Sequence, residues 1–188
     1  MALEIEIKLK VDSLQPTAEK LKQLGAKFEG DFLQIDSYYD DNKDSLVNSD
    51  RCLRIRKHKN HIGEAIELTY KGARENHRFK TRREIGLKVD KAEELAELFE
   101  QLGYKVRLTL EKKRSLWDFQ DCKVALDQLP LIGTFVEIEG PSDDIIEQVQ
   151  KDLALENLKH EPASYAHLME QAIAKAGLKT RIITLDKK

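Results

Sequence analysis

The chain has few cysteines, and neither is placed like a metal ligand. Cys52 and Cys122 are the two cysteines among 188 residues, and neither belongs to a CxxC pair. Because no secretory hydrophobic segment is recognisable, we expect both thiols to be reduced and the protein to be cytoplasmic. The sequence also lacks an apolar run near the roughly 18 residues that span a bilayer, so no membrane partner is expected.

Neither acidic nor basic residues are in large excess. Lysine plus arginine total 32 and aspartate plus glutamate total 34, which gives a formal net charge of −2. This balance provides no general attraction to nucleic acid or to an anionic membrane, so nucleic acid is not expected as a partner. With 40% hydrophobic and 35% charged residues, the composition is typical of a single globular domain.

Three familiar active-site patterns are absent. Gly25 and Gly30 have the glycine spacing of a phosphate-binding loop, but Asp31 follows where that loop needs a lysine. The GxSxG motif of nucleophilic hydrolases does not occur. His58 and His61 lie three positions apart, but a zinc site needs more ligands than this pair supplies. Any phosphate chemistry must therefore depend on other residues.

Four stretches have the spacing and the boundaries of amphipathic helices. The first covers residues 15–24, and the second begins at Asp90, where Glu93 completes a capping-box pattern. Two more follow Ser142 and Ser164, which are suitable N-cap residues. Each helix is expected to pack one face on a core.

Between the helices, polar and apolar residues alternate with the period of β-strands. The predicted strands cover residues 4–10, 32–39, 52–57, 65–71, 80–88, 108–118, 123–127 and 134–139. Eight strands are enough to close a small barrel. The predicted fold class is therefore α+β, an eight-stranded antiparallel β-barrel with the amphipathic helices packed outside it.

The sequence also repeats at a constant offset of 78 residues. EIEIKLKVD at residues 4–12 matches RREIGLKVD at residues 82–90, and the LGAK that follows the first helix matches LGYK after the second. We interpret residues 1–178 as one domain with two pseudo-equivalent halves, although unrelated strand-helix units can also converge on such a match. Residues 179–188 are expected to form a frayed tail, with an edge strand at residues 182–185 as the alternative.

The polar faces of these strands carry formal charges of both signs at two-residue spacing. They include Glu4, Glu6 and Lys8 on the first strand, and five strands share the pattern. The alternating apolar residues need the helices to bury them, so the helices are expected outside the barrel and the charges inside. The apolar set comprises Ile5, Ile7, Leu53, Ile55, Leu110, Leu116, Val136 and Ile138.

Charges inside a barrel require compensation, which indicates a bound polyanion together with a metal ion. Arginine forks and lysine ammonium groups suit the oxygens of a triphosphate. The candidates for this role are Arg54, Arg56, Lys71, Arg82, Lys112 and Arg114. Carboxylates suit a hard cation, Mg²⁺ or Mn²⁺. The candidate ligands are Glu4, Glu6, Asp127, Glu137 and Glu139.

The same residues carry a family resemblance. Residues 4–8, EIEIK, resemble the ExExK signature of the CYTH superfamily, the triphosphate tunnel metalloenzymes. The resemblance continues in order through LRIR at 53–56, LTYKG at 68–72, Arg82 with Glu84, Lys112 with Arg114, and GTFVEIEG at 133–140. It implies an antiparallel tunnel, a small-molecule triphosphate held by the basic residues, and divalent ions held by the acidic ones, with Glu84 in support.

Two reactions are implied by this resemblance. The length and the LIGTFVEIEG segment resemble the class IV adenylyl cyclase branch, which converts ATP to cyclic AMP and pyrophosphate. The alternative is a triphosphatase that hydrolyses inorganic or thiamine triphosphate, and a further one is a module that binds polyphosphate or nucleotide without catalysis. A homodimer is compatible with the sequence.

Three residues have more than one candidate role. Lys8 is either a general base or a phosphate ligand. Tyr38 and Lys71 could approach each other across the tunnel, an arrangement that resembles the one proposed for some family triphosphatases. For Tyr38, simple packing in the core is the alternative.

Overall fold

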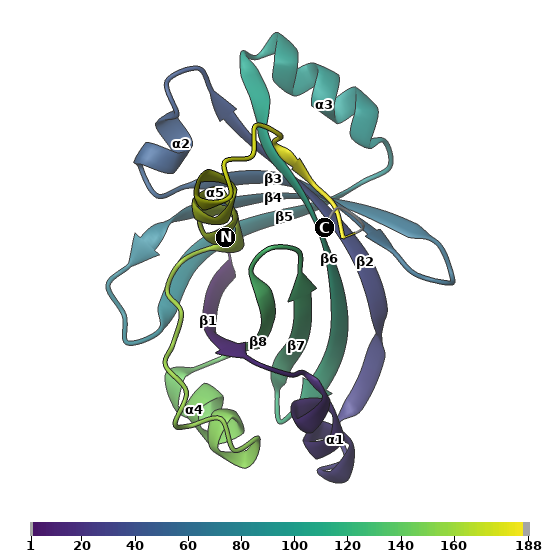
Figure 1. The fold of residues 1–188 in the computed structure, drawn as a ribbon, viewed down its shortest axis with the longest axis vertical. Coiled ribbons are helices and arrows are strands. Elements are labelled where there is room, and N and C mark those ends of the chain that lie inside the picture. Colours follow the sequence, from purple (N-terminus) through teal and green to yellow (C-terminus); the bar gives the residue numbers. More distant parts are fainter. Residues whose placement is uncertain (1, 186–188) are drawn as a thin grey trace.

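The computed structural model describes residues 2–185, and eight of its strands form one closed antiparallel barrel. The order around the barrel is β2-β3-β4-β5-β1-β8-β7-β6, and a pairing of β6 with β2 closes it (Figure 1). The predicted fold class is therefore confirmed. The strands are β1 (Ala2–Val11), β2 (Lys27–Asp41), β3 (Cys52–Lys59), β4 (Glu64–Glu75), β5 (Lys80–Val89), β6 (Tyr104–Phe119), β7 (Cys122–Leu129) and β8 (Gly133–Gly140).

Helices cover the barrel from several sides. The four predicted helices are present, and a short fifth one, α2, lies between β2 and β3. In Figure 1, α1 and α4 lie at the lower end, α3 at the top, and α5 in the upper half of the molecule. The helices are α1 (Gln15–Gln23), α2 (Ser45–Asn48), α3 (Ala92–Gln101), α4 (Asp143–Asp152) and α5 (Tyr165–Lys175). None of the helices between residues 2 and 185 has the length and apolarity needed to cross a membrane.

Strand alternation separates an apolar outer face from a charged inner face. Ile7, Leu9 and Ile138 are almost fully buried under α1 and α4, in one hydrophobic cluster. On the other side of the barrel, Ile55 and Phe99 belong to a second cluster, between β3 and α3. These apolar contacts hold the helices against the wall and leave the opposite side of each strand facing the interior.

Helix α5 departs from this pattern, because it covers one end of the barrel. Tyr165 and Met169 pack on Leu108, Leu110 and Phe135, which are inward-facing positions of β6 and β8. Leu110 and Leu116 share the strand face of Lys112 and Arg114, so the expectation that they lie on the outer face is wrong. The physical reason is that residues of equal parity point to the same side of a strand.

The predicted capping box at the start of α3 is also wrong. Lys91 is the N-cap residue, and it makes no side-chain capping hydrogen bond. Glu93 Oε1 instead accepts a hydrogen bond from Lys57 Nζ at 2.6 Å. A cross-element ion pair has therefore replaced the local cap, whereas Ser142 and Ser164 do cap α4 and α5 as expected.

The C-terminal segment is ordered against the barrel. Strand β9 (Ile182–Ile183) pairs in parallel with β6, and Ile183 is buried. Leu185 N donates to Glu111 Oε2 at 3.1 Å. The expectation of a frayed tail is therefore wrong for residues 182–185, because Ile183 gains a buried apolar site; residues 186–188 lie outside the described part of the chain.

The strand register agrees with the internal repeat. In the β1–β5 pairing Glu4 lies opposite Arg82, and in the β2–β6 pairing Gln34 lies opposite Lys112. Both pairs differ by the same offset of 78 positions that relates the repeated sequences. This is the relation that a pseudo-twofold axis through the barrel requires. It favours the interpretation of two halves, which stays a proposal.

Gly140, at the end of β8, lies where α4 packs closely on the barrel. A methyl group there lies 2.6 Å from Cys122 Sγ and 2.9 Å from Ile146 Cγ1. Gly140→Ala is therefore expected to lower the free energy of unfolding by about 1–3 kcal/mol, measured by urea denaturation. Gly63→Ala, which meets open space, is the control, with an expected change of about 0.5 kcal/mol or less. Equal losses in the two variants would contradict the packing argument.

Candidate functional site

Two cavities occupy the interior of the barrel, one toward each end. The larger, about 320 Å³, extends to α2 and the start of α5, and the smaller, about 210 Å³, extends to Phe32 and Lys123. They share wall residues in the middle, namely Glu6, Arg56, Arg114, Glu137 and Glu139. The two cavities are therefore the two ends of one charged tunnel.

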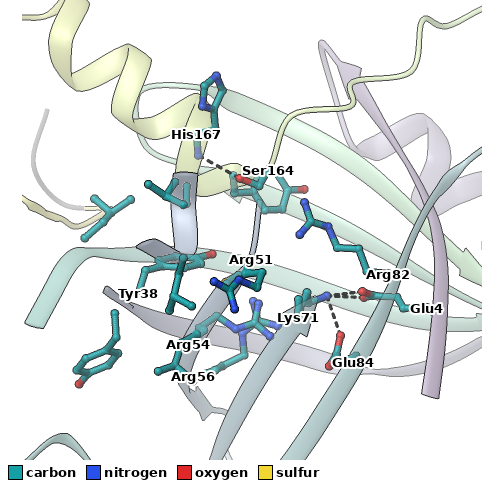
Figure 2. Close-up of a pocket in the computed structure, with 18 of the residues that line it drawn as sticks. Glu4, Tyr38, Arg51, Arg54, Arg56, Lys71, Arg82, Glu84, Ser164 and His167 are labelled. Carbon is teal, nitrogen blue, oxygen red and sulfur yellow. Dashed lines mark hydrogen bonds and ion pairs between the residues drawn. The ribbon is translucent and has the colours of Figure 1, made fainter. Parts of the chain in front are cut away.

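The predicted site residues meet in this tunnel, with one exception. All of them except Asp127 line the larger cavity: Glu4, Glu6, Lys8, Tyr38, Arg54, Arg56, Lys71, Arg82, Glu84, Lys112, Arg114, Glu137 and Glu139. Asp127 faces the same side as Arg114, but it is fully buried beneath Arg114, Lys112 and Tyr165. The close-up in Figure 2 shows Arg54, Arg56 and Lys71 in a row, with Glu4 and Glu84 beside Lys71.

Asp36 anchors two of the arginines. Arg56 Nε and Nη2 donate to its two carboxylate oxygens at 2.5 and 2.6 Å, and Arg54 Nη1 lies 3.9 Å away. Burial alone would raise the pKa of Asp36, but the charges of Arg56 and Arg54 outweigh it and hold the pKa well below its usual range. Asp36 therefore stays ionised and fixes both guanidinium groups in the tunnel wall.

Asp127 anchors the other side of the basic set. Its carboxylate accepts hydrogen bonds from Arg114 Nε at 2.7 Å, Arg114 Nη2 at 2.5 Å and Tyr165 Oη at 2.8 Å. Lys112 Nζ lies 3.5 Å away. In this structure Asp127 positions Arg114, and a role as a metal ligand would require these contacts to break.

Lys112 and Lys8 are cations in an enclosed setting. Burial, together with the positive charge of Arg114, lowers the pKa of Lys112 to about 7, although Asp127 acts in the opposite direction. Burial also lowers the pKa of Lys8, whose Nζ donates to Ala163 O at 2.6 Å. Both ammonium groups lie over the ring of Tyr165, at 4.3 Å for Lys8 and 4.9 Å for Lys112. An anion in the tunnel would favour the charged form of both lysines.

The carboxylates of β1 are paired with lysines of neighbouring strands. Lys71 Nζ donates to both oxygens of Glu4, at 2.5 and 2.6 Å, and lies 2.9 Å from Glu84 Oε2. Lys80 Nζ donates to Glu6 Oε1. Glu4 and Glu6, the two acidic residues of the ExExK segment, are therefore neutralised by this chain's own ammonium groups.

Glu139 differs from these carboxylates, because no ion pair or hydrogen bond compensates it in the described residues. It lies opposite Glu6 in the β1–β8 pairing. Burial and the negative charge of Glu4 raise the pKa of Glu139 to about 7, against the opposing effect of Lys71. A cation beside Glu139 would reverse this shift.

The donor set suits a hard divalent cation, but its present arrangement does not enclose one. Glu4, Glu6 and Glu139 lie on the adjacent strands β1 and β8 and offer oxygen ligands only, as Mg²⁺ and Mn²⁺ prefer. Within residues 2–185, no three acidic, histidine or cysteine side chains converge closely enough to hold a metal ion. The residues fit the cation in chemistry, and two of the three carboxylates, Glu4 and Glu6, are paired with lysines.

Tyr38 and Lys71 do not meet in this structure. Tyr38 Oη donates to Asp36 Oδ2 at 3.3 Å, and burial raises the pKa of this phenol well above its usual value. Arg54, on the strand between β2 and β4, lies between the two residues (Figure 2). Lys71 is held by the carboxylates of Glu4 and Glu84 instead.

Several site residues were not predicted from the sequence. Asp36 and Lys80 lie at inward positions of predicted strands, so strand parity could have identified them. Tyr165 and Asp50 gave no such signal, because they reach the site from a helix and a loop. Asp50 accepts hydrogen bonds from Arg82 Nη1 through its backbone oxygen, at 2.6 Å, and from Arg82 Nη2 through Oδ1, at 2.7 Å.

Helix α2 brings apolar side chains to the larger cavity. Leu46 and Val47 line it there beside polar and charged side chains, among them Arg51, Arg107 and His167. Asp40 holds α2 in place, because its two carboxylate oxygens accept the N–H groups of Leu46 and Val47, both at 2.9 Å. A ligand with phosphates in the tunnel could therefore place an organic part against a mixed apolar and polar lining.

Comparisons with known proteins agree on this architecture. The sequence model of the CYTH domain matches residues 2–167. A proposed adenylate cyclase of Methanocaldococcus jannaschii is 33% identical over 156 residues, which cover 83% of this chain and 85% of that protein. The PH1012 protein of Pyrococcus horikoshii, a solved structure, has a TM-score of 0.74 at 30% identity and covers 86% of this chain and 96% of its own.

A plant protein extends the likeness at the level of the fold alone. This Hippeastrum protein, described as a proposed adenylyl cyclase with a dominant triphosphatase activity, has a TM-score of 0.64. Its identity is 15%, and the match covers 96% of this chain and 98% of that one.

The raised pKa of Glu139 can be tested directly. Glu4→Gln removes a neighbouring negative charge, so the pKa of Glu139 is expected to fall from about 7 toward its ordinary value of 4.5. The measurement is a pH titration of the side-chain carboxyl by ¹³C NMR in metal-free buffer. Glu19→Gln, on the exposed side of α1, is the control and should leave the titration unchanged.

The same pKa determines a pH dependence of stability. Because the folded-state pKa of Glu139 lies above its unfolded value, the associated stability is fully present below about pH 4.5 and is lost as pH rises through about 7. Glu139→Gln is therefore expected to weaken the fall of metal-free stability across that interval. An unchanged slope would contradict the shift.

Proposed function

The chain belongs to the CYTH domain family, and on this premise we propose that its tunnel binds a small-molecule triphosphate and cleaves it with the help of a divalent cation. The leading reaction is that of an adenylyl cyclase, in which ATP yields cyclic AMP and pyrophosphate. One observation supports the proposal above all. Arginines fixed by buried aspartates line the same enclosed tunnel as a group of carboxylates.

The basic side chains would bind the phosphate groups. Arg56 and Arg114 are held rigidly by Asp36 and Asp127, so little side-chain entropy is lost when they meet an anion. Phosphoryl transfer depends mainly on positioning and on stabilising the charge of the transition state, which fixed cations provide. The full basic set comprises Lys8, Arg54, Arg56, Lys71, Arg82, Lys112 and Arg114.

Glu4, Glu6 and Glu139 would hold Mg²⁺ or Mn²⁺, with Glu137 nearby and Glu84 in support through Lys71. When bound, the cation would supply neutralisation of phosphate charge and would promote loss of the attacking oxygen's proton. In the cyclase reaction, the ribose 3′-oxygen forms a bond to the α-phosphorus, and the bond from that phosphorus to the pyrophosphate oxygen breaks.

Lys8 is assigned as a phosphate ligand in this scheme. Its Nζ donates to Ala163 O and lies 3.8 Å from Glu137 Oε1, so it is already positioned by two acceptors. A neutral Lys8 could instead accept the proton of the hydroxyl. The lowered pKa of Lys8 is compatible with either role.

The lining beside α2 favours a nucleotide over inorganic triphosphate. Val47, which is exposed and lines the larger cavity, offers apolar contact surface for a base, whereas inorganic triphosphate would leave it unused. The resemblance to the Methanocaldococcus jannaschii protein, a proposed adenylate cyclase, supports the same reaction. The proposed partner is this small molecule and not nucleic acid. The proposed location is the cytoplasm.

A triphosphatase is the second candidate, and the far end of the tunnel supports it. The smaller cavity reaches Arg56 and Arg114, so water has access to the phosphate that would lie deepest. In this reaction, a water oxygen forms a bond to the terminal phosphorus, and the bond from that phosphorus to the bridging oxygen breaks. The products are orthophosphate, the remaining diphosphate as leaving group, and the proton that the water releases to solvent. The Hippeastrum protein shares only the fold, but its described activity illustrates that this fold can support the reaction.

Product analysis distinguishes the candidates. The purified protein is incubated with ATP, inorganic triphosphate or thiamine triphosphate and Mg²⁺ or Mn²⁺, and the products are resolved by ³¹P NMR and chromatography. Cyclic AMP with pyrophosphate is the expected result. Orthophosphate release without cyclic AMP would replace the cyclase by the triphosphatase, and binding without turnover would leave a non-catalytic module.

Glu6→Gln tests the metal assignment. Loss of one carboxylate ligand is expected to reduce metal-dependent turnover by about 10² to 10³-fold, which corresponds to several kcal/mol of lost charge stabilisation. Activity is measured over a range of Mn²⁺ concentrations, and circular dichroism checks the fold. Glu156→Gln, at an exposed position beyond α4, should retain full activity. Full activity in Glu6→Gln would contradict the assignment.

A further inference from the structure

Lys80 was not among the predicted site residues, yet it faces the centre of the candidate metal site. We infer that Lys80 and Lys71 are paired with Glu6 and Glu4 in the free protein and move to phosphate oxygens when triphosphate binds. This exchange frees the two carboxylates for the divalent cation, so that triphosphate and cation bind cooperatively. The inference rests on the proposed function, because it specifies how the same tunnel takes up its two ligands.

The position of Lys80 follows from the strand register. It lies directly opposite Glu6 in the β1–β5 pairing, and both side chains point into the tunnel. The side chains are 16% and 10% exposed, and Lys80 Nζ donates to Glu6 Oε1. Lys80 therefore occupies the position beside Glu6 that a bound cation would need.

Lys71 occupies the equivalent position beside Glu4. Its Nζ contacts both oxygens of Glu4 and one of Glu84, so its hydrogens have acceptors on two strands. The side chains of Lys71 and Glu4 are 17% and 12% exposed. Because like charges repel strongly in such a setting, a divalent cation binds these carboxylates only weakly while both ammonium groups remain.

Each ligand by itself therefore meets an obstacle. A triphosphate that takes Lys71 and Lys80 leaves Glu4 and Glu6 unpaired, and a cation that takes the carboxylates leaves two lysines unpaired. When both bind, every charge has a partner. Binding energies coupled in this way are reciprocal, so each ligand must raise the affinity of the protein for the other.

Glu139 agrees with this scheme. It adds a carboxylate next to Glu6 and has no ion-pair partner among the described residues. The acidic side of the tunnel therefore still lacks positive charge after both lysines are counted. A cation that arrives with the triphosphate would supply it.

Two ordinary roles for Lys80 make different predictions. If Lys80 only stabilises the barrel, its loss should weaken or leave unchanged the binding of both ligands. If it only binds phosphate, its loss should weaken triphosphate binding and leave binding of the metal alone unchanged. The exchange requires changes of opposite sign.

The experiment measures the two ligands separately with Lys80→Met. Binding of Mn²⁺ alone is followed by electron paramagnetic resonance, and binding of inorganic triphosphate alone by calorimetry in EDTA. We expect the Kd of Mn²⁺ to fall about tenfold and the Kd of triphosphate to rise about tenfold, within the usual range of coupling between sites. Lys113→Met, an exposed lysine on the outer face of β6, is the control for the change in charge and should alter neither constant.

The outcomes separate the inference from the proposed function. A wild-type protein that fails to bind triphosphate, with or without Mn²⁺, would overturn the proposed function. A wild-type protein that binds both, with Mn²⁺ binding unchanged or weakened in Lys80→Met, would overturn the exchange alone. If Lys80→Met does not fold by circular dichroism, Lys80→Gln, which can still donate to Glu6, is measured in its place with the same expected directions.

Discussion

Charged side chains that face the inside of a closed barrel must find partners, and this requirement organises the whole molecule. Asp36 holds Arg56, Asp127 holds Arg114, and Glu4 holds Lys71. Without such pairs, the desolvation of so many charges would oppose folding. The pairs also fix the guanidinium groups before any ligand binds. The same ion pairs therefore stabilise the barrel and preorganise the site.

Burial of the apolar face of each strand offsets the cost of the charged interior. Ile7, Leu9 and Ile138 pack under helices on the outer face, where burial of apolar surface provides the main favourable contribution to folding. Most of the hydrophobic core therefore lies between the wall and the helices. Inside the wall are the charged side chains and, under α5, the apolar cluster that includes Leu108, Leu110 and Phe135.

One end of the tunnel is built by segments that lie outside the barrel strands. Helix α5 brings Tyr165 to Asp127, the segment before it places Ala163 O on Lys8, and the loop after α2 brings Asp50 to Arg82. The other end is lined by strand residues such as Phe32 and Lys123. The two ends therefore differ in the segments that form them.

The sequence by itself determined the eight strands, four of the five helices and the inward face of each charged strand, because residue alternation sets which side chains share a face. It could not determine which carboxylate meets which cation. The pairing of Lys80 with Glu6, the burial of Asp127 beneath Arg114 and Tyr165, and the separation of Tyr38 from Lys71 depend on the register between strands and on α5. Those arrangements join residues far apart in the chain, and only the closed barrel brings them within contact distance.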